Sequence, residues 1–379
     1  MSVPHLSPGR SSGARAAALF PDEVSALTPV KTIRSELQHH LDEAVASGVA
    51  PAVSCAVVVG GRELPVLTAG AAGPDTFFDL ASITKLFTTV TALALVDRGV
   101  LELDAPLGRH LSPYARGEKS AVTLRHLLTH TSGLPSEWTG WHAALSRAHG
   151  FDRTALLADL MTTPLEAPPG TRFAYSCAGY NTVMALAEHV TATPWAELVQ
   201  YWVLERLATH DITGSPRLEH CAPTEFQPGL GRGTVRGIVH DEAAWSLGGL
   251  SGNAGMFATA DGLRVFGSAL LQGLPGILSP AVAEDMWQDQ LAKMLGEHVN
   301  PAEPGFGQGL GLRINQQPWM GVEGTQARGH GGFTGTSLLV DKSRGIVIAL
   351  LTNRVNPSRD GDDATALRKA VSDVVYSVA

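Results

Sequence analysis

The chain has 379 residues, of which 44% are hydrophobic and 17% are charged, and its formal net charge is −8. This composition is too apolar for a disordered chain and supplies enough residues for a sizeable core, in two or three domains or in one unit of two subdomains. Nucleic acids and anionic membranes attract concentrated Lys and Arg, and the sequence has no such cluster, so we expect neither as a partner.

The first 29 residues are rich in Ser, Pro, Gly, Ala and Arg. They lack the apolar core of a secretory signal, and no stretch elsewhere reaches the ~18 apolar residues of a membrane span. We therefore expect residues 1–29 to form a loose segment and the protein to be cytoplasmic. Cys55, Cys177 and Cys221 are odd in number and far apart, which favours reduced thiols over a disulfide framework.

Apolar periodicity predicts a helix and two strands near the start of the chain. The helix is expected over residues 31–46, where Ile33 begins its apolar face. The strands are expected over residues 53–59 and 64–69, separated by a Gly60-Gly61 turn. These strands lead into a long apolar run.

Ser82 and Lys85 lie three residues apart at the start of this apolar run. Side chains at positions i and i+3 of a helix are neighbours, so the hydroxyl and the amine would share a face. A serine becomes nucleophilic when another group accepts its proton, and a lysine at this spacing can take that proton or hold its charge. The flanking residues are apolar nearly all round, so the helix is expected to be buried.

Residues from about 100 to 300 read as helical or irregular segments, and they contain the sequence Tyr175-Ser-Cys177. Strands are then expected over 309–314, 337–341 and 346–352, and a helix from about 363 to 378 closes the chain. A sheet built from both chain ends, with a helical insertion between them, is an α+β layout.

The paired residues His126 and His130 are four apart, as two metal ligands on a helix face would be. No third ligand is evident, so we expect core or capping histidines and no metal site. Three tryptophans in the expected helical region are open to two interpretations, aromatic walls of a substrate pocket or ordinary core residues. These are Trp138, Trp141 and Trp245.

Three motifs in order resemble those of the serine β-lactamase and penicillin-recognising superfamily. Ser82-x-x-Lys85 matches its S-x-x-K element, and His330-Gly331-Gly332 matches its K-T-G or H-x-G triplet. Tyr175-x-Cys177 corresponds to its Y-x-N element, with Cys in place of Asn. The segments 127–135 and 351–354 also resemble its class C branch, which includes family VIII carboxylesterases, D-aminopeptidases and transesterases.

The resemblance implies a β-lactamase-like α+β fold over residues 30–378, as a single catalytic domain. An antiparallel sheet flanked by helices would be built from residues of about 30–80 and 305–378. A mostly helical part would span about 81–304, and the active site would lie between the two parts.

The resemblance also implies the site residues. Ser82 would be the nucleophile, with Lys85 and Tyr175 as catalytic partners and no cofactor. The backbone N–H groups of Ser82 and Phe333 would form the oxyanion hole. His330, in place of the triplet's usual lysine, would be a donor to the substrate or to Tyr175, and its charge is left open.

The glycines of the triplet and one cysteine are expected to contact substrate. Gly331 and Gly332 would let the backbone approach it. Cys177 stands where the family usually has an Asn, whose amide positions the acyl amide of a β-lactam or peptide. A thiol is a weak donor and acceptor, so this departure favours esters. Cys177 as an alternative nucleophile stays open, although the S-x-x-K motif is intact.

Proton transfer from Ser82 requires Lys85 or Tyr175 to have a pKa below its usual value near 10. Burial destabilises an ammonium, and an adjacent ammonium favours a phenolate, so we expect the two groups to share one proton near neutral pH. Which of them is the base is left open.

We therefore predict a serine hydrolase that forms an acyl-enzyme on Ser82 and acts as a carboxylesterase on small esters. The alternatives are an acyltransferase or transesterase in secondary metabolism, a D-peptidase or β-lactamase, and a non-catalytic ligand receptor on the same scaffold. Intact Ser82, Lys85 and Tyr175 disfavour the receptor. The partner would be a small-molecule ester or amide, and the physiological substrate, stereochemical preference and oligomeric state are open.

Overall fold

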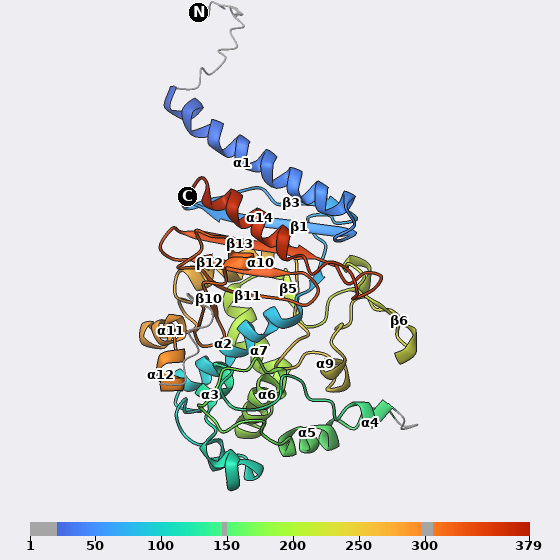
Figure 1. Ribbon diagram of the computed structural model, residues 1–379, viewed down its shortest axis with the longest axis vertical. Coiled ribbons are helices and arrows are strands. Elements are labelled where there is room, and N and C mark those ends of the chain that lie inside the picture. Colours follow the sequence, from blue (N-terminus) through green and yellow to red (C-terminus); the bar gives the residue numbers. More distant parts are fainter. Residues whose placement is uncertain (1–20, 146–149, 297–305) are drawn as a thin grey trace, which may run out of the picture.

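The computed structural model describes residues 21–145, 150–296 and 306–379, and its centre is an eight-stranded antiparallel sheet (Figure 1). The strand order is β2-β1-β13-β12-β11-β10-β9, and β3 also pairs with β1. Strands from the two chain ends therefore lie side by side, as predicted. The bounds are β1 (Ala52–Val59), β2 (Arg62–Glu63), β3 (Leu67–Gly70), β9 (Gly307–Gln308), β10 (Arg313–Ile314), β11 (Arg328–Gly331), β12 (Ser337–Asp341) and β13 (Ile346–Thr352).

Helices cover both faces of this sheet, so its central strands are apolar on both sides. In β1, Val53 and Val57 pack in the core beneath α1 (Pro21–Ala46) and α14 (Thr365–Tyr376). Ala56, which points the other way, packs in the larger core that reaches into the helical part. Successive side chains of a strand point to opposite faces, and β1, which is buried and apolar apart from Ser54, serves both cores.

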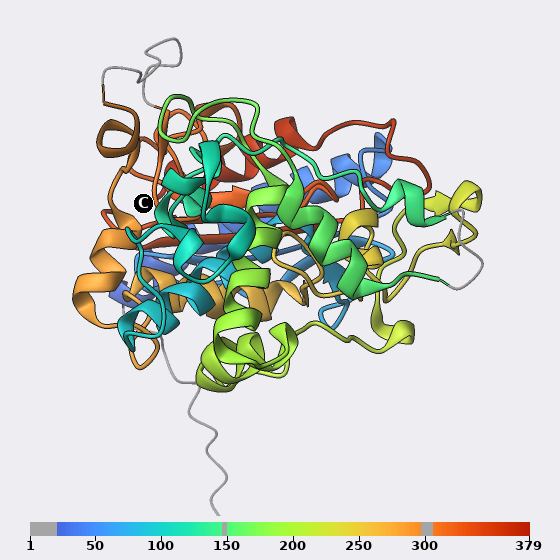
Figure 2. The same ribbon diagram turned by 90° about the horizontal axis from the view of Figure 1, so that it is seen from below.

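The helical part fills the side of the sheet opposite α1 and α14, and Figure 2 shows its helices in front of the sheet. Three short strands, β4 (Phe78–Asp79), β8 (Phe257–Ala258) and β5 (Ile212–Thr213), form a second sheet at the junction of the two parts. The helices are α2 (Thr84–Asp97), α3 (Leu124–Leu128), α4 (His142–Leu145), α5 (Arg153–Thr162), α6 (Cys177–Thr191), α7 (Trp195–Val199), α8 (Glu205–Leu207), α9 (Glu242–Ser246), α11 (Pro280–Trp287) and α12 (Leu291–Leu295).

Helix α10 (Ala260–Leu271) packs on the central sheet. It lies within 81–304, the range assigned to the helical part, yet it packs against β1, β12 and β13. The helix approaches the sheet closely at Gly267, where an added Cβ would lie 2.5 Å from Val347 Cγ1. Periodicity reveals an amphipathic helix but not the surface that its apolar face covers.

Several predicted bounds are confirmed and others are wrong for identifiable reasons. The strands expected over 337–341 and 346–352 are β12 and β13. The strand expected over 64–69 begins only at Leu67, as β3, because Pro65 has no N–H to donate to β1; β2 ends at Glu63, before the expected range. The expected strand over 309–314 is replaced by the shorter β9 and β10.

Helix α1 begins at Pro21, ten residues before the predicted start, so part of the segment expected to be loose is helical. Proline is favoured in the first helical turn because its φ angle is already set and its missing N–H needs no partner there. Residues 1–20 of that segment lie outside the described residues. No helix within the described ranges combines the length and the apolar character that a membrane crossing needs.

Candidate active site

Ser82 lies at a sharp turn between β4 and α2. A single 3-10 turn (Ala81–Ile83) precedes α2, and Ala81 has φ of 46°, a left-handed conformation that is strained for a residue with a Cβ. Asp79 stabilises this turn, since its Oδ1 accepts a hydrogen bond of 2.8 Å from the Ala81 N–H. The turn places Ser82 at the front of the buried helix that carries Lys85.

The predicted shared face of Ser82 and Lys85 is confirmed. Lys85 is fully buried, and its Nζ lies 3.1 Å from Ser82 Oγ, 3.4 Å from Cys177 Sγ and 3.1 Å from the Asn253 carbonyl oxygen. An ammonium has three N–H donors, and these three neighbours match them in number. The sequence motif therefore folds into a lysine held against a serine.

Tyr175 reaches the same serine from another part of the chain. It precedes α6, whose first turn is capped by Ser176, since the Ser176 Oγ accepts from the Gly179 N–H at 2.9 Å. The Tyr175 hydroxyl donates to Ser82 Oγ at 2.8 Å, and Lys85 Nζ lies 4.9 Å from the centre of the Tyr175 ring. The structure thus brings the first two predicted motifs together.

The protonation of this pair differs from our prediction. Burial disfavours the ammonium of Lys85, but attraction to the side chains of Cys177 and Tyr175 outweighs burial and raises the pKa of Lys85. Burial of the phenol outweighs the attraction of Lys85 and raises the pKa of Tyr175. Both shifts favour the protonated forms near neutral pH, opposite in direction to the lowering that we expected, and the sharing of one proton by the two groups remains a prediction.

This protonation state predicts that Ser82 reacts faster at higher pH. A group with a raised pKa is protonated at neutral pH and becomes available as a base only as the pH rises toward that pKa. Labelling of Ser82 by a fluorophosphonate is expected to accelerate steadily from about pH 6 to about pH 9, after correction for hydrolysis of the free reagent. A labelling rate that is flat across this range would contradict the assignment.

His330 belongs to β11 and lies beside Tyr175, with 6.0 Å between the ring centres. Its Nδ1 is 2.7 Å from the Gly331 carbonyl oxygen, which only accepts, so Nδ1 carries the proton. Burial, with the charges of Arg313 and Lys85, holds the pKa of His330 well below its usual range. The ring is therefore neutral, and its buried Nε2, which has no partner among the described residues, is an acceptor. The predicted role of His330 as a donor to the substrate or to Tyr175 remains a prediction.

Two backbone N–H groups in the described structure are available at the predicted oxyanion hole. Neither the Ser82 N–H nor the Phe333 N–H donates to an acceptor within the described residues. The Phe333 loop is tied to the Ser82 turn, because Thr334 Oγ1 donates to the Asp79 carbonyl oxygen at 2.7 Å and Thr336 Oγ1 to that of Leu80 at 3.2 Å. Such donors suit a negative charge that develops next to Ser82 Oγ.

The glycine at position 332 is required by close contacts between the Phe333 loop and the Ser82 turn. A Cβ on Gly332 would lie 2.2 Å from Thr336 Oγ1 and 2.5 Å from the Leu80 carbonyl oxygen. A Cβ on Gly331 would lie 3.8 Å from the Arg368 guanidinium carbon. The requirement for glycine at 332 thus comes from close contact within the protein, and the predicted substrate contacts of both glycines remain predictions.

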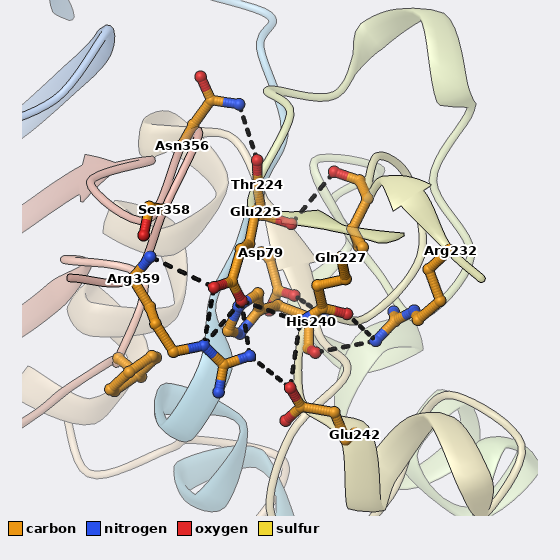
Figure 3. Close-up of polar contacts among 12 residues, drawn as sticks. Asp79, Thr224, Glu225, Gln227, Arg232, His240, Glu242, Asn356, Ser358 and Arg359 are labelled. Atoms are coloured by element: carbon orange, nitrogen blue, oxygen red, sulfur yellow. Dashed lines mark hydrogen bonds and ion pairs between the residues drawn. The ribbon is translucent and has the colours of Figure 1, made fainter. Parts of the chain in front are cut away.

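A polar network supports the half-exposed ring of Phe333 (49% exposed). The His240 ring stacks against Phe333 with 5.8 Å between centres, and the His240 N–H donates to Asp79 below the Ser82 turn. Figure 3 shows Arg359 reaching Glu225 in this network. Burial alone would raise the pKa of Glu225, but hydrogen bonds, the one from Arg359 foremost, lower it to about 2. The Glu225 carboxylate therefore stays charged at neutral pH.

Sequence reasoning missed three groups that surround Tyr175 and Lys85. The Asn253 carbonyl oxygen receives Lys85, and Arg313 lies 4.8 Å from the Tyr175 ring centre. His130 is buried 4.7 Å from the same ring, and its Nδ1 accepts from the Ser176 N–H. Backbone acceptors and ring packing leave no sequence signal, although the Gly-Leu-Ser-Gly-Asn253 segment is distinctive.

The two histidines have the structural roles that we expected. His126 completes a capping box with Thr123 at the start of α3, and His130 packs in the core. Within residues 21–145, 150–296 and 306–379, no group of three or more His, Cys, Asp or Glu side chains is arranged to hold a metal ion.

Two of the tryptophans line cavities away from Ser82. Trp245 lines a cavity of about 730 Å³ with Ile238, Leu250 and Phe257, and Trp138 lines another of about 520 Å³. Ser82 lines neither of these two cavities, and the two interpretations of the tryptophans stay open.

Comparisons with known proteins agree with this arrangement. A sequence model of the Beta-lactamase family matches residues 37–372. Esterase EstB of Burkholderia gladioli is 31% identical over 78% of this chain and 82% of its own length. EstCE1, a hydrolase with promiscuous acyltransferase activity, has a TM-score of 0.71 at 22% identity, over 92% of this chain and 99% of its own. A D-stereospecific amidohydrolase from Streptomyces has a TM-score of 0.67 at 26% identity, over 88% and 97% of the two chains.

Proposed function

This chain belongs to the Beta-lactamase family, and we propose from that premise that it is a serine carboxylesterase that forms its acyl-enzyme on Ser82. One observation carries the proposal: Ser82 Oγ lies within 2.8 Å of the Tyr175 hydroxyl and 3.1 Å of Lys85 Nζ. A nucleophile, its proton-handling partners and two available N–H donors therefore converge on one point.

The proposed reaction has two steps with the same proton carriers. Ser82 Oγ attacks the ester carbonyl while its proton passes to the Lys85 and Tyr175 pair, after that pair has lost one proton to solvent. The carbonyl oxygen becomes negative and is stabilised by the N–H groups of Ser82 and Phe333. The bond from carbon to the alcohol oxygen then breaks, and the alcohol leaves with the proton. Water repeats the sequence on the acyl-enzyme and releases the acid.

Cys177 supports esters rather than amides as substrates. Its Sγ faces Lys85 Nζ at 3.4 Å, so it lies inside the proposed site at the place of the amide that other family members carry. A thiol is a weak hydrogen-bonding partner, and an unpaired polar group on a substrate amide costs roughly 1 to 3 kcal/mol. Esters have better leaving groups and need less help, and the similar EstB is named an esterase.

Replacing Cys177 by Asn is expected to narrow the preference for esters. The wild type should turn over a short-chain aryl ester faster than nitrocefin, and Cys177→Asn should raise nitrocefin acylation relative to ester turnover by about 5- to 150-fold, from the energy above. The measurement is kcat/KM for both substrates. Cys221→Ser, which alters a buried thiol that does not contact Lys85, is the control and should leave the ratio unchanged.

Amide hydrolysis is the second candidate, because the chain is 26% identical to a D-stereospecific amidohydrolase over most of both lengths. It replaces the esterase proposal if the wild type prefers nitrocefin or a D-amino-acid amide to every ester tested. If Cys177→Asn leaves the ratio of nitrocefin to ester kcat/KM unchanged, Cys177 does not determine the preference for esters.

A further inference from the structure

The oxyanion hole needs a Phe333 N–H that points in a fixed direction, and helix α14 supplies a group that can fix it. The N–H of Phe333 belongs to the same peptide unit as the carbonyl oxygen of Gly332. A peptide unit is planar and trans, so its C=O and N–H point in opposite directions. Whatever holds the Gly332 oxygen therefore also orients the Phe333 N–H.

Arg368 holds that oxygen. Its Nη2 donates to the Gly332 carbonyl oxygen at 2.8 Å. The same guanidinium also donates to the carbonyl oxygens of Gly335 at 3.2 Å and Thr336 at 3.1 Å. One side chain on α14 thus ties down three carbonyls of the loop that carries Phe333.

The hydrogen bonds of Arg368 go to backbone carbonyls and, among the described residues, to no carboxylate. Burial lowers the pKa of Arg368 to about 10, so the guanidinium is still charged at neutral pH. A positive charge on the carbonyl side of a peptide draws electron density toward the oxygen and makes the N–H on the other side a stronger donor. Its field also favours a negative charge beyond that N–H.

We propose that Arg368 is a positioning residue of the oxyanion hole: it fixes and polarises the Gly332–Phe333 peptide so that the Phe333 N–H meets the oxyanion formed at Ser82. This inference rests on the proposed function. Arg368 acts through the peptide and does not itself need to contact the substrate.

The test compares the wild type with Arg368→Met, which keeps length without the charge, and Arg368→Lys, which keeps the charge with fewer donors. A slowly hydrolysed ester labelled with 13C at its carbonyl supplies the acyl group. Difference infrared spectra of the acyl-enzyme report how strongly the oxyanion hole binds that carbonyl. Lys369→Gln is the matched control, because it removes the next cation on α14, which pairs with Asp373.

Arg368→Met is expected to lower kcat for an aryl ester by about 10- to 100-fold, with KM changed less than about 3-fold. Removing an oxyanion-hole donor lowers kcat by about 100- to 1,000-fold, and this substitution weakens one donor without removing it. The acyl carbonyl band should move to higher wavenumber in Arg368→Met and less far in Arg368→Lys. Lys369→Gln should match the wild type in both readouts.

A carbonyl band that stays in place in both variants would overturn the proposal, whether or not kcat falls, because a merely structural role does not need to move it. If Arg368→Met fails to fold, the band of Arg368→Lys decides alone. If the wild type forms no adduct on Ser82, the proposed function fails and this inference fails with it. A wild-type adduct with unchanged bands in the variants contradicts Arg368 alone.

Discussion

Replacing Ser82 by Ala is expected to lower kcat for an aryl ester by about 10⁵-fold or more, the scale at which a serine hydrolase loses its nucleophile. Lys85 and Tyr175 both form hydrogen bonds with Ser82 Oγ, and the alanine variant lacks this hydroxyl, which is the group that they would activate. Residual turnover would come from the oxyanion hole and binding alone. Steady-state kinetics with purified variants measures the loss.

The control for this prediction is Ser120→Ala, which removes an exposed hydroxyl in the helical part and should leave kcat unchanged. Cys177→Ala provides the decisive contrast, because its Sγ also contacts Lys85. If Ser82→Ala keeps most of the activity while Cys177→Ala abolishes it, the thiol is the nucleophile and the proposed mechanism is wrong.

Lys85→Ala and Tyr175→Phe are each expected to lower kcat by about 10³-fold or more, and the double variant should be little worse than either single one. The reason is that both groups act on the proton of the Ser82 hydroxyl. Each forms a hydrogen bond with Ser82 Oγ, and each shifts the pKa of the other. When one is lost, the other cannot complete the transfer. A double-mutant cycle on kcat measures this coupling.

Tyr180→Phe is the matched control for the tyrosine. Tyr180 is buried in the core of the helical part, and its hydroxyl donates to the Leu128 carbonyl oxygen and not to Ser82. Its loss should affect stability more than kcat. Losses in Lys85→Ala and Tyr175→Phe that multiply fully in the double variant would show that the two groups act independently.

The spacing of residues along the sequence predicted those contacts of the site that form within a single helix. Ser82 and Lys85 share a face because any helix places positions i and i+3 together, and the structure has them 3.1 Å apart. That Tyr175 would join them came from the resemblance to a family, since no spacing rule links two residues that are 93 positions apart.

Tautomers and pKa values, which depend on the neighbouring groups in the folded protein, could not be predicted from the sequence. The carbonyl of Gly331 fixes the tautomer of its neighbour, His330, and leaves Nε2 as an acceptor. The pKa values of Lys85 and Tyr175 were expected to fall, whereas the balance between burial and mutual attraction raises both. Arg368 lies in a helix that gave no functional signal at all.

The fold shows the same division between local and long-range information. Strands β12 and β13 were predicted with their bounds because buried strands read as continuous apolar runs between turn residues. The packing of helix α10 on the sheet could not be predicted, since it depends on the close approach of Gly267 to Val347 and Leu338 in distant strands.

The most direct test of the central claim is to locate the acyl group itself. The protein is mixed with a slowly hydrolysed aryl ester and the reaction is quenched in acid. The intact mass of the protein is measured, and the acylated peptide is then identified by digestion and mass spectrometry. We expect one acyl group per chain, carried by the peptide that contains Ser82, and none in Ser82→Ala. An acyl group mapped to Cys177, or ester turnover with no covalent adduct, would contradict the account.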